Sequence, residues 1–246
     1  MSTAKETSVP PLLFTAFVFS ALGFLVFGSA SFAQSAHKRI KSSPTQKVEF
    51  LGWKSAERPL TDLNKNAFAL QTSVAKSNHD AAELLISIRA STTFLRDRWT
   101  HSLEHPPVPK SYVESLQLDA DTLGGLTGRR LSDQNTNAIL RDVADDLEIK
   151  VAHCKASLKG WASVISVNIN TLKQGNPIAG LEVWYVPKGW TDVPERWMRC
   201  PKLSSPATAG QLPPGKYMVR VAGAPAVPVT VGGSGKDEQS IDLLVP

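Results

Sequence analysis

The chain lacks the residue sets by which the common classes of enzyme are recognised. Gly232-Gly-Ser-Gly-Lys236 looks like part of a phosphate-binding loop, but Thr230 stands where that loop needs its first glycine, and no serine or threonine follows Lys236. We therefore interpret it as a hairpin turn. Serines are plentiful, yet none stands in a motif that would mark it as a nucleophile. From the sequence we expect a protein that is not an enzyme and that holds no cofactor.

An excess of positive over negative charge is scarce outside one short segment. The formal net charge is +5, but residues 34–58 hold six Lys or Arg against two Asp or Glu, so most of the excess lies there. A nucleic-acid-binding domain would instead carry a basic stripe on a folded face, so nucleic acid is not expected as a partner. Residues 34–58 are interpreted as a flexible tether, in which Lys38, Arg39 and Lys41 could contact an anionic membrane surface.

Cysteine is rare, with two in 246 residues. In an oxidising compartment an even, low count indicates one disulfide, here between Cys154 and Cys200. Such a bridge would fasten the helical part of the chain to the β-rich part. The alternative is a pair of separate buried thiols.

The N-terminal segment, residues 1–33, has the layout of a secretory signal peptide. An unbroken apolar run, Leu12–Gly28, leads into small residues that end in Ser-Phe-Ala, which predicts cleavage after Ala33. The remaining chain is then exported to the periplasm or beyond the cell. The alternative is a single-pass membrane anchor, because a basic cluster follows the run and positive charge normally stays on the cytoplasmic side.

No glycine or proline interrupts residues 60–104, where apolar or small residues recur at alternating spacings of four and three. This spacing predicts a single long helix, which Pro106 and Pro107 end. The residues on its apolar stripe are Leu63, Ala67, Leu70, Val74, Ser77, Ala81, Leu84, Ile88, Ser91 and Leu95.

A second apolar stripe follows a connector that we expect over residues 106–131, with one helical turn near Ser111–Leu118. It runs from Leu140 to Trp161 and predicts a second helix. Two amphipathic helices joined by a turn-rich connector most simply pair antiparallel. We therefore expect a helical hairpin over residues 59–160, with a dimer of long helices as the alternative.

From Trp161 onward the apolar period changes to two, which is the period of a strand with one buried face. The apolar members of five predicted strands are Ile165, Val167 and Ile169; Leu181, Val183 and Tyr185; Tyr217, Val219 and Val221; Val227, Val229 and Val231; and Ile241, Leu243 and Val245. Turn-forming Gly and Pro clusters separate them. This pattern predicts an antiparallel β-sandwich over residues 161–246, and so an α+β protein.

Two motifs in this β-rich part carry a family resemblance. Gln174-Gly-Asn-Pro-Ile-Ala-Gly180, leading into Leu181-Glu-Val183, follows the pattern G-x-P-x-x-G-x-x-V, and Leu212-Pro-Pro-Gly-Lys-Tyr217 follows LPPGxY. In these stretches residues 165–246 resemble the carboxypeptidase-regulatory-like, or transthyretin-like, β-sandwich family. The resemblance implies an accessory module without catalysis of its own. His101-Ser-Leu-Glu104 matches the H-x-x-E of zinc carboxypeptidases, and we interpret that match as accidental.

Three tryptophans are the candidate binding residues. Trp184 points outward from its predicted strand, while Trp190 and Trp197 belong to a long excursion over residues 187–209. Exposed tryptophans stack on sugar rings, which predicts carbohydrate binding. The alternative is that the excursion folds over Trp184 and forms a second small core.

A weaker candidate is a metal site at the end of the first predicted helix. Asp97, His101 and His105 stand at i, i+4 and i+8, a spacing that suits zinc or copper, but no fourth ligand is apparent. A solvated helix end explains the three residues equally well.

The sequence therefore predicts an exported, non-enzymatic protein of the bacterial envelope that serves as an interaction or structural module. Its partner would be an envelope protein or a polysaccharide, and its helices could support oligomers. The alternatives are a carbohydrate-binding module and a weak metal-binding protein.

Overall fold

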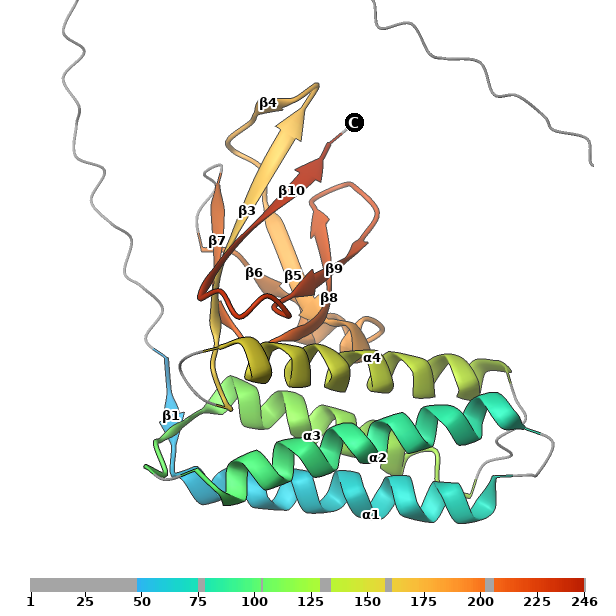
Figure 1. Ribbon diagram of the computed structural model, residues 1–246. Helices are drawn as coiled ribbons and strands as arrows, with labels where there is room; N and C mark the ends of the chain where they lie inside the picture. Colours follow the sequence, from blue (N-terminus) through green and yellow to red (C-terminus); the bar gives the residue numbers. More distant parts are fainter. Residues whose placement is uncertain are drawn as a thin grey trace, which may run out of the picture. The chain divides into compact units, whose positions relative to one another are not determined.

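The structure is a computed structural model that describes residues 48–74, 78–102, 104–128, 134–157, 161–201 and 206–245. These residues belong to one compact unit, Ser42–Pro246, and combine helices with β-sheets, which confirms the α+β class (Figure 1). The predicted signal peptide and the basic cluster of Lys38, Arg39 and Lys41 lie outside the described residues. In the described part of the chain, no helix is both long enough and apolar enough to span a membrane.

The described part contains a four-helix bundle in which successive helices run in opposite directions (Figure 1). The helices are α1 (Glu57–Ser73), α2 (His79–Thr100), α3 (Lys110–Gly124) and α4 (Gln134–Ala156). α1 packs against α2 and α3, and α4 packs against the same two helices. The expected two-helix hairpin is therefore wrong in helix number and in its pairing, because α4 contacts α2, which runs in the same direction as α4.

The single long helix expected over residues 60–104 is also wrong. α1 ends at Ser73, and α2 begins after Asn78, whose Oδ1 accepts a hydrogen bond from the backbone N of Ala81 (3.1 Å). This N-cap satisfies one of the N–H groups that a helix leaves free at its start. Because α1 and α2 pack together, the turn lets the two halves of the predicted stripe bury each other.

The segment expected as a connector contains α3 instead. Four of its buried residues recur at helical spacing: Tyr112, Leu116, Ala120 and Leu123. Pro109 directly precedes the helix and Gly125 follows it, so the turn-forming residues mark its ends and leave its interior regular. The second predicted helix is confirmed as α4.

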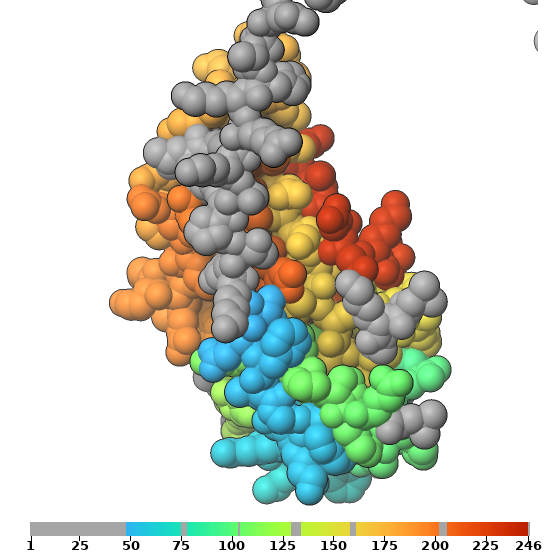
Figure 2. Space-filling model, turned by 90° about the vertical axis from the view of Figure 1, so that its left-hand side faces the viewer, coloured from blue at the N-terminus to red at the C-terminus, as the bar shows by residue number. Residues whose placement is uncertain are grey.

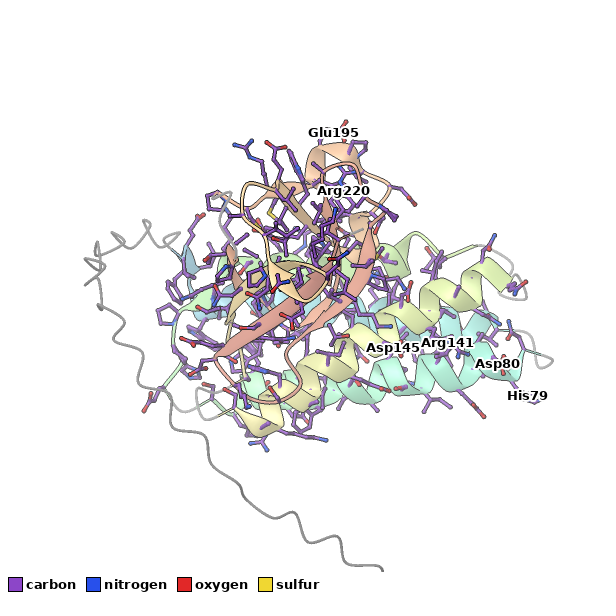
Figure 3. All side chains as sticks on the ribbon, turned by 90° about the horizontal axis from the view of Figure 1, so that it is seen from above. His79, Asp80, Arg141, Asp145, Glu195 and Arg220 are labelled. Atoms are coloured by element: carbon purple, nitrogen blue, oxygen red, sulfur yellow. The ribbon has the colours of Figure 1, made fainter. Side chains whose placement is uncertain are left out.

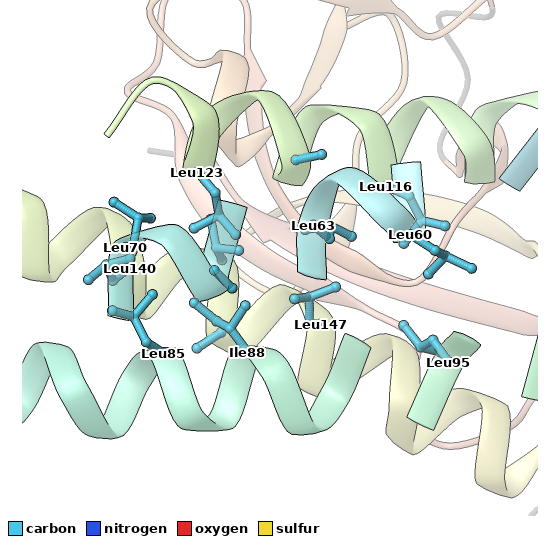
Figure 4. Close-up of a cluster of buried hydrophobic side chains, with 14 of the residues drawn as sticks. Leu60, Leu63, Leu70, Leu85, Ile88, Leu95, Leu116, Leu123, Leu140 and Leu147 are labelled. Atoms are coloured by element: carbon cyan, nitrogen blue, oxygen red, sulfur yellow. The ribbon is translucent and has the colours of Figure 1, made fainter. Parts of the chain in front are cut away.

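The apolar stripes of the four helices meet in one core (Figure 4). Its largest aliphatic members are Leu60, Leu63, Leu70, Leu85, Ile88, Leu95, Leu116, Leu123, Leu140 and Leu147. The stripe that might have served as an interaction surface is thus occupied within the bundle itself.

A short two-stranded sheet ties the chain before α1 to the start of α3. β1 (Phe50–Leu51) pairs antiparallel with β2 (Val108–Pro109). Next to it, the backbone N of Lys110 donates to the carbonyl oxygen of Glu49 (2.9 Å). The pairing therefore holds Glu49 beside Lys110.

Two larger sheets pack face to face as a sandwich. The first contains β3 (Ile165–Lys173), β4 (Asn176–Pro177), β7 (Ala207–Leu212) and β10 (Glu238–Leu244). The second has the order β6 (Met198–Arg199), β5 (Val183–Pro187), β8 (Gly215–Val221) and β9 (Val227–Val231). Side chains of both sheets, among them Val167 and Val219, share one hydrophobic core. The five predicted strands are confirmed as β3, β5, β8, β9 and β10.

One strand pairing differs from the antiparallel expectation. β10 pairs parallel with β3, with Ile241 opposite Ile169, so the first sheet is mixed. β3 and β10 are the first and last strands of the sandwich. A tight hairpin would force two strands to run antiparallel, but no hairpin joins this pair, so the two strands can run parallel. A period of two shows which face of a strand is buried and says nothing of its direction.

The excursion after β5 folds back onto the second sheet. η2 (Lys188–Trp190) contacts α3 and β8, and β6 pairs with β5. Val186 points to the outer face of β5 by alternation, yet it is fully buried. The outer face of β5 is therefore covered at Val186. Trp184, on the same face, stays partly exposed.

Candidate functional site

Two neighbouring hollows lie where α3 meets the sandwich. The larger, which we call the aromatic cleft, has a volume of about 440 Å³, and the smaller, the charged hollow, has about 310 Å³. Ser115, Pro187 and Tyr217 line both, so the two adjoin. Figure 2 shows the blue residues around β1 next to the orange residues of the sandwich, and residues of both segments line the aromatic cleft. Ligand sites often form where two packed parts of a chain meet.

The aromatic cleft combines aromatic rings with polar side chains. Its aromatic members are Tyr185, Trp190 and Tyr217. Its charged and amide side chains are Glu49, Lys110, Glu114, Glu195, Arg196 and Gln211. Flat apolar surface and hydrogen-bonding groups are therefore present in the same cavity.

The short helix η2 places Trp190 in the wall of this cleft. Gly189 lies against α3, because a Cβ at this position would come within 3.3 Å of the Leu118 side chain. The guanidinium of Arg196 stacks over the Trp190 ring, 4.5 Å from its centroid. The ring is thus held by the helix on which its segment rests and by the cation stacked on it.

Both tyrosines of the cleft keep their protons at neutral pH. Burial, and after it the neighbouring Cys200, raises the pKa of Tyr185 to about 12. Burial also raises the pKa of Tyr217, whose hydroxyl donates to the carbonyl oxygen of Pro213 (3.1 Å). The two tyrosines are therefore neutral, and the charged groups of the aromatic cleft lie in the solvent-exposed part of its lining.

An ion pair marks that exposed part. Lys110 Nζ lies 2.8 Å from Glu49 Oε2, and this hydrogen bond raises the pKa of Lys110. Both side chains remain largely in solvent, so the pair adds little to stability. Its carboxylate and ammonium can still form hydrogen bonds with a ligand at the mouth of the cleft.

Trp184 and Trp197 lie around Arg220 and do not line the cleft. In the sheet register, Trp184 stands opposite Arg199 of β6 and Arg220 of β8, so these three side chains point to the same face. The guanidinium of Arg220 lies over the Trp197 ring, 4.2 Å from its centroid. We call these four residues the Trp–Arg face. The structure thus separates the predicted trio, with Trp190 in the cleft and the other two tryptophans on this face.

The charged hollow adjoins a buried lysine that no sequence pattern indicated. The Nζ of Lys150 lies 3.1 Å from Asp119 Oδ2 and also pairs with Asp146. Burial lowers the pKa of Lys150 and raises that of Asp119, while their mutual attraction opposes both shifts. Asp146 and Lys150 are i, i+4 neighbours on α4, a spacing typical of exposed helix pairs, so only the tertiary packing shows that this pair is buried.

Aspartates of α4 fasten the bundle to the sandwich. Asp146 Oδ1 accepts a hydrogen bond from the backbone N of Lys216 (2.6 Å), and Asp145 pairs with the Lys216 side chain. Asp142 Oδ1 lies 2.5 Å from Lys188 Nζ. The charged side chains of the charged hollow are therefore already used to hold the bundle to the sandwich. Of the two cavities, the aromatic cleft is the better candidate for a ligand site.

The structure does not assemble the predicted metal site. α2 ends at Thr100, so His105 lies beyond the helix that was expected to carry it. His105 has a positive φ of 41°, and its ring stacks on Trp53 with 4.0 Å between centroids. The His101 Nδ1 lies 2.7 Å from the carbonyl oxygen of Asp97, away from that residue's carboxylate. Within the described ranges, no group of three or more His, Cys, Asp or Glu could hold a metal ion.

The predicted disulfide is also absent from the structure. Cys154 and Cys200 are free cysteines that pack in different hydrophobic clusters, Cys154 against the bundle core and Cys200 in the sandwich core. Burial raises the pKa of Cys154, and it raises that of Cys200 to about 11. Both sulfurs are therefore thiols at neutral pH, which is the alternative that the sequence left open.

No protein-family model and no curated protein matches the chain. Among solved structures, the chain is similar to the crystal structure of (S)-allantoin synthase, with 13% identity over 77% of this chain and 95% of that chain and a TM-score of 0.24. The expectation that the protein is not an enzyme is contradicted by this match, since that structure is an enzyme's, and we withdraw it. At this TM-score the match shows neither a shared fold nor a shared activity.

Proposed function

We propose that the protein is an exported component of the bacterial envelope that binds a carbohydrate chain in the aromatic cleft. The observation that carries the proposal is the position of Trp190, whose ring lines the cleft beside carboxylate, amide and cationic side chains. A sugar ring has an apolar C–H face and a rim of hydroxyl groups. Its binding therefore calls for a flat aromatic surface with hydrogen-bond donors and acceptors around it.

The dimensions of the cleft are consistent with such a ligand. Its volume of about 440 Å³ lies within the range of about 300–1,000 Å³ that is typical of ligand pockets. A short stretch of a polysaccharide would fill it, and the rest of the chain would continue over the surface.

The helices support the cleft, and α3 also lines it with Lys110, Ser111, Glu114 and Ser115. Their apolar stripe is buried in the bundle core, so it is not offered to an envelope protein or to a second copy. Export rests on the composition of residues 1–33, and membrane contact by the basic tether stays a prediction. The resemblance of residues 165–246 to carboxypeptidase-regulatory-like domains likewise stays a prediction.

A comparison of two aromatic-to-alanine variants tests the proposal. Titration of the purified protein with a panel of neutral and acidic polysaccharides, followed by tryptophan fluorescence and affinity electrophoresis, should identify at least one ligand. Trp190→Ala should weaken its binding at least about tenfold, a loss of about 1.4 kcal/mol. Phe68→Ala is the matched control, because Phe68 is an exposed aromatic ring on α1 with Arg89 stacked over it at 5.3 Å.

Two results would contradict the proposal. The first is the absence of any fluorescence or mobility change across the panel. The second is equal binding by Trp190→Ala and Phe68→Ala, because the ligand would then lie outside the aromatic cleft.

A further inference from the structure

Two arginines lie over tryptophan rings in this region, Arg220 on the Trp–Arg face and Arg196 in the adjoining aromatic cleft. Arg199 is paired with Glu182, at 2.8 Å between Nη1 and Oε1. Among the residues that the structure describes, Arg196 and Arg220 form no ion pair, and each is stacked on a tryptophan instead. Because neither guanidinium is neutralised by a carboxylate of the described residues, both are available for an external anion.

Stacking leaves the hydrogen-bonding edge of a guanidinium free. A guanidinium that contacts a ring through its flat face keeps its N–H donors, which lie in its plane, free for another partner. These donors form a rigid fork that matches the two oxygens of a carboxylate. The Arg220 guanidinium, whose Cζ lies 4.2 Å from the centroid of the Trp197 ring, can therefore offer this fork to a planar anion.

The neighbour of Arg220 in the sheet is an aromatic ring. Trp184 stands directly opposite it on β5, and opposite residues in an antiparallel pair have Cβ atoms about 4.5–5.5 Å apart. A ligand on this face thus meets a ring and a cation side by side. A uronic acid has the same arrangement, because its carboxylate is attached to the sugar ring itself.

The Trp–Arg face and the aromatic cleft belong to one surface. Arg196 and Trp190 line the cleft, and Trp197, which follows Arg196 directly in the chain, lies under Arg220. Trp197 Nε1 donates to the carbonyl oxygen of Thr191 (3.1 Å), which closes this segment on itself. In Figure 3, Glu195 and Arg220 lie on the same side of the sandwich, away from the bundle residues Asp80 and Arg141.

We infer that the Trp–Arg face binds an acidic polysaccharide, with Arg220 pairing with the carboxylate of a uronic acid and Trp184 contacting its ring. The inference rests on the proposed carbohydrate-binding function and adds the chemical class of the ligand. Glu195 at the rim and Glu182, which neutralises Arg199, limit the positive charge of the surface. Selectivity therefore depends on the geometry at Arg220 more than on net charge.

The test compares two forms of one polymer. Polygalacturonate and its fully methyl-esterified form share a backbone, but esterification removes the carboxylate charge. The purified protein should bind polygalacturonate at least about tenfold more tightly than the ester. Because salt screens exposed charges, with a Debye length of about 10 Å at 0.1 M and about 3 Å at 1 M, this preference should shrink as salt is raised.

Variants of the arginine place the effect on the Trp–Arg face. Arg220→Gln should remove the preference for the acid form, and Arg220→Lys should restore only part of it, because lysine lacks the fork. Arg98→Gln is the matched control, since Arg98 is an exposed arginine stacked over Phe94 on the bundle (5.4 Å). Near-ultraviolet circular dichroism establishes that Arg220→Gln is folded, and Arg220→Lys serves as the test variant if it is not.

Each contrary result has one meaning. Equal binding of acid and ester overturns the inference while leaving the carbohydrate-binding function in place. A preference that survives Arg220→Gln places acid recognition elsewhere and also overturns it. Equal binding of a single-stranded DNA oligonucleotide overturns it in favour of general polyanion binding. Failure of every glycan to bind removes the proposed function, and the inference with it.

Discussion

Lys150 and Asp119 form an ion pair in the protein interior, where the Lys150 side chain is 0% exposed and that of Asp119 is 8% exposed. The pair joins α4 to α3 next to β8, and Asp146 completes it from the neighbouring turn of α4. Removing two charges from water is costly, and their attraction offsets that cost only while both are present. Substitutions that remove only one of these charged residues should therefore destabilise the junction between the bundle and the sandwich most.

Replacing Lys150 by methionine should lower the free energy of unfolding by about 3–5 kcal/mol, because two carboxylates would stay buried without their cation. The double variant Asp119→Leu/Lys150→Met should recover much of that loss. Urea unfolding followed by circular dichroism measures both, with Lys65→Met on the exposed face of α1 as the control. Simple additivity of the two single changes would show that the pair is not coupled.

Stability should fall as the pH drops below 6.5, because His153 is buried in α4. Neither of its ring nitrogens has a hydrogen-bond partner among the residues that the structure describes, and burial lowers its pKa from 6.5, although the charge of Asp237 opposes the shift. Below pH 6.5 the unfolded chain therefore takes up a proton that the folded protein resists, and unfolding becomes more favourable.

Unfolding free energies measured between pH 8 and pH 5 test this prediction. His153→Leu should flatten the slope in this range, whereas His79→Gln, at the exposed start of α2, should leave it unchanged. A slope that is the same in the His153→Leu variant would show that other groups cause it.

Gly215→Ala should destabilise the protein by about 1–3 kcal/mol, the usual cost of overpacking a filled site. A Cβ at this position would come within 2.5 Å of Asp146 Oδ1, and that carboxylate is already held by Lys150 and by the Lys216 backbone. Gly52→Ala is the matched control, because nothing lies within 4 Å of its Cβ and its φ is −58°. Thermal unfolding of the two variants should differ by several degrees, and equal melting temperatures would refute the clash.

Both cysteines should be found as thiols. Mass labelling in denaturant without reductant should add two alkyl groups, and a reducing agent should leave the melting temperature unchanged. In the native protein at pH 8, Cys200 should react slowly, because it is buried and its pKa is raised to about 11. A chain that takes up label only after reduction would restore the disulfide that the cysteine count suggested.

Local patterns in the sequence predicted the strands and α4, because a strand or helix with one buried face repeats that face in its sequence. The same patterns missed the break between α1 and α2, where no glycine or proline interrupts the chain and only the N-cap at Asn78 marks the new helix. α3 was missed for the opposite reason. The turn-forming residues around it, Pro109 and Gly125, hid the regular spacing of Tyr112 and Leu116.

The site was less predictable than the fold, because it is made of contacts between distant residues. Trp190 was singled out from its type, but its cleft also depends on Glu49 and Lys110, which the β1–β2 pairing brings together. Arg220 carried no signal in the sequence, since the register that places it beside Trp184 depends on how β5 and β8 align. Spacing along the chain likewise gave no indication that Cys154 and Cys200 would pack in separate cores.

The parallel pairing of β10 with β3 delays the moment at which the sandwich can close during synthesis. β3 lies between β7 and β10 in its sheet, so a nascent chain that ends at Val231 has one edge of β3 unpaired. Ile169 finds its partner only when Ile241 has left the ribosome, and such distant pairings form slowly. For a protein that is exported as proposed, the sandwich stays incomplete until its last strand has been made, and an incompletely folded polypeptide is more easily threaded across a membrane.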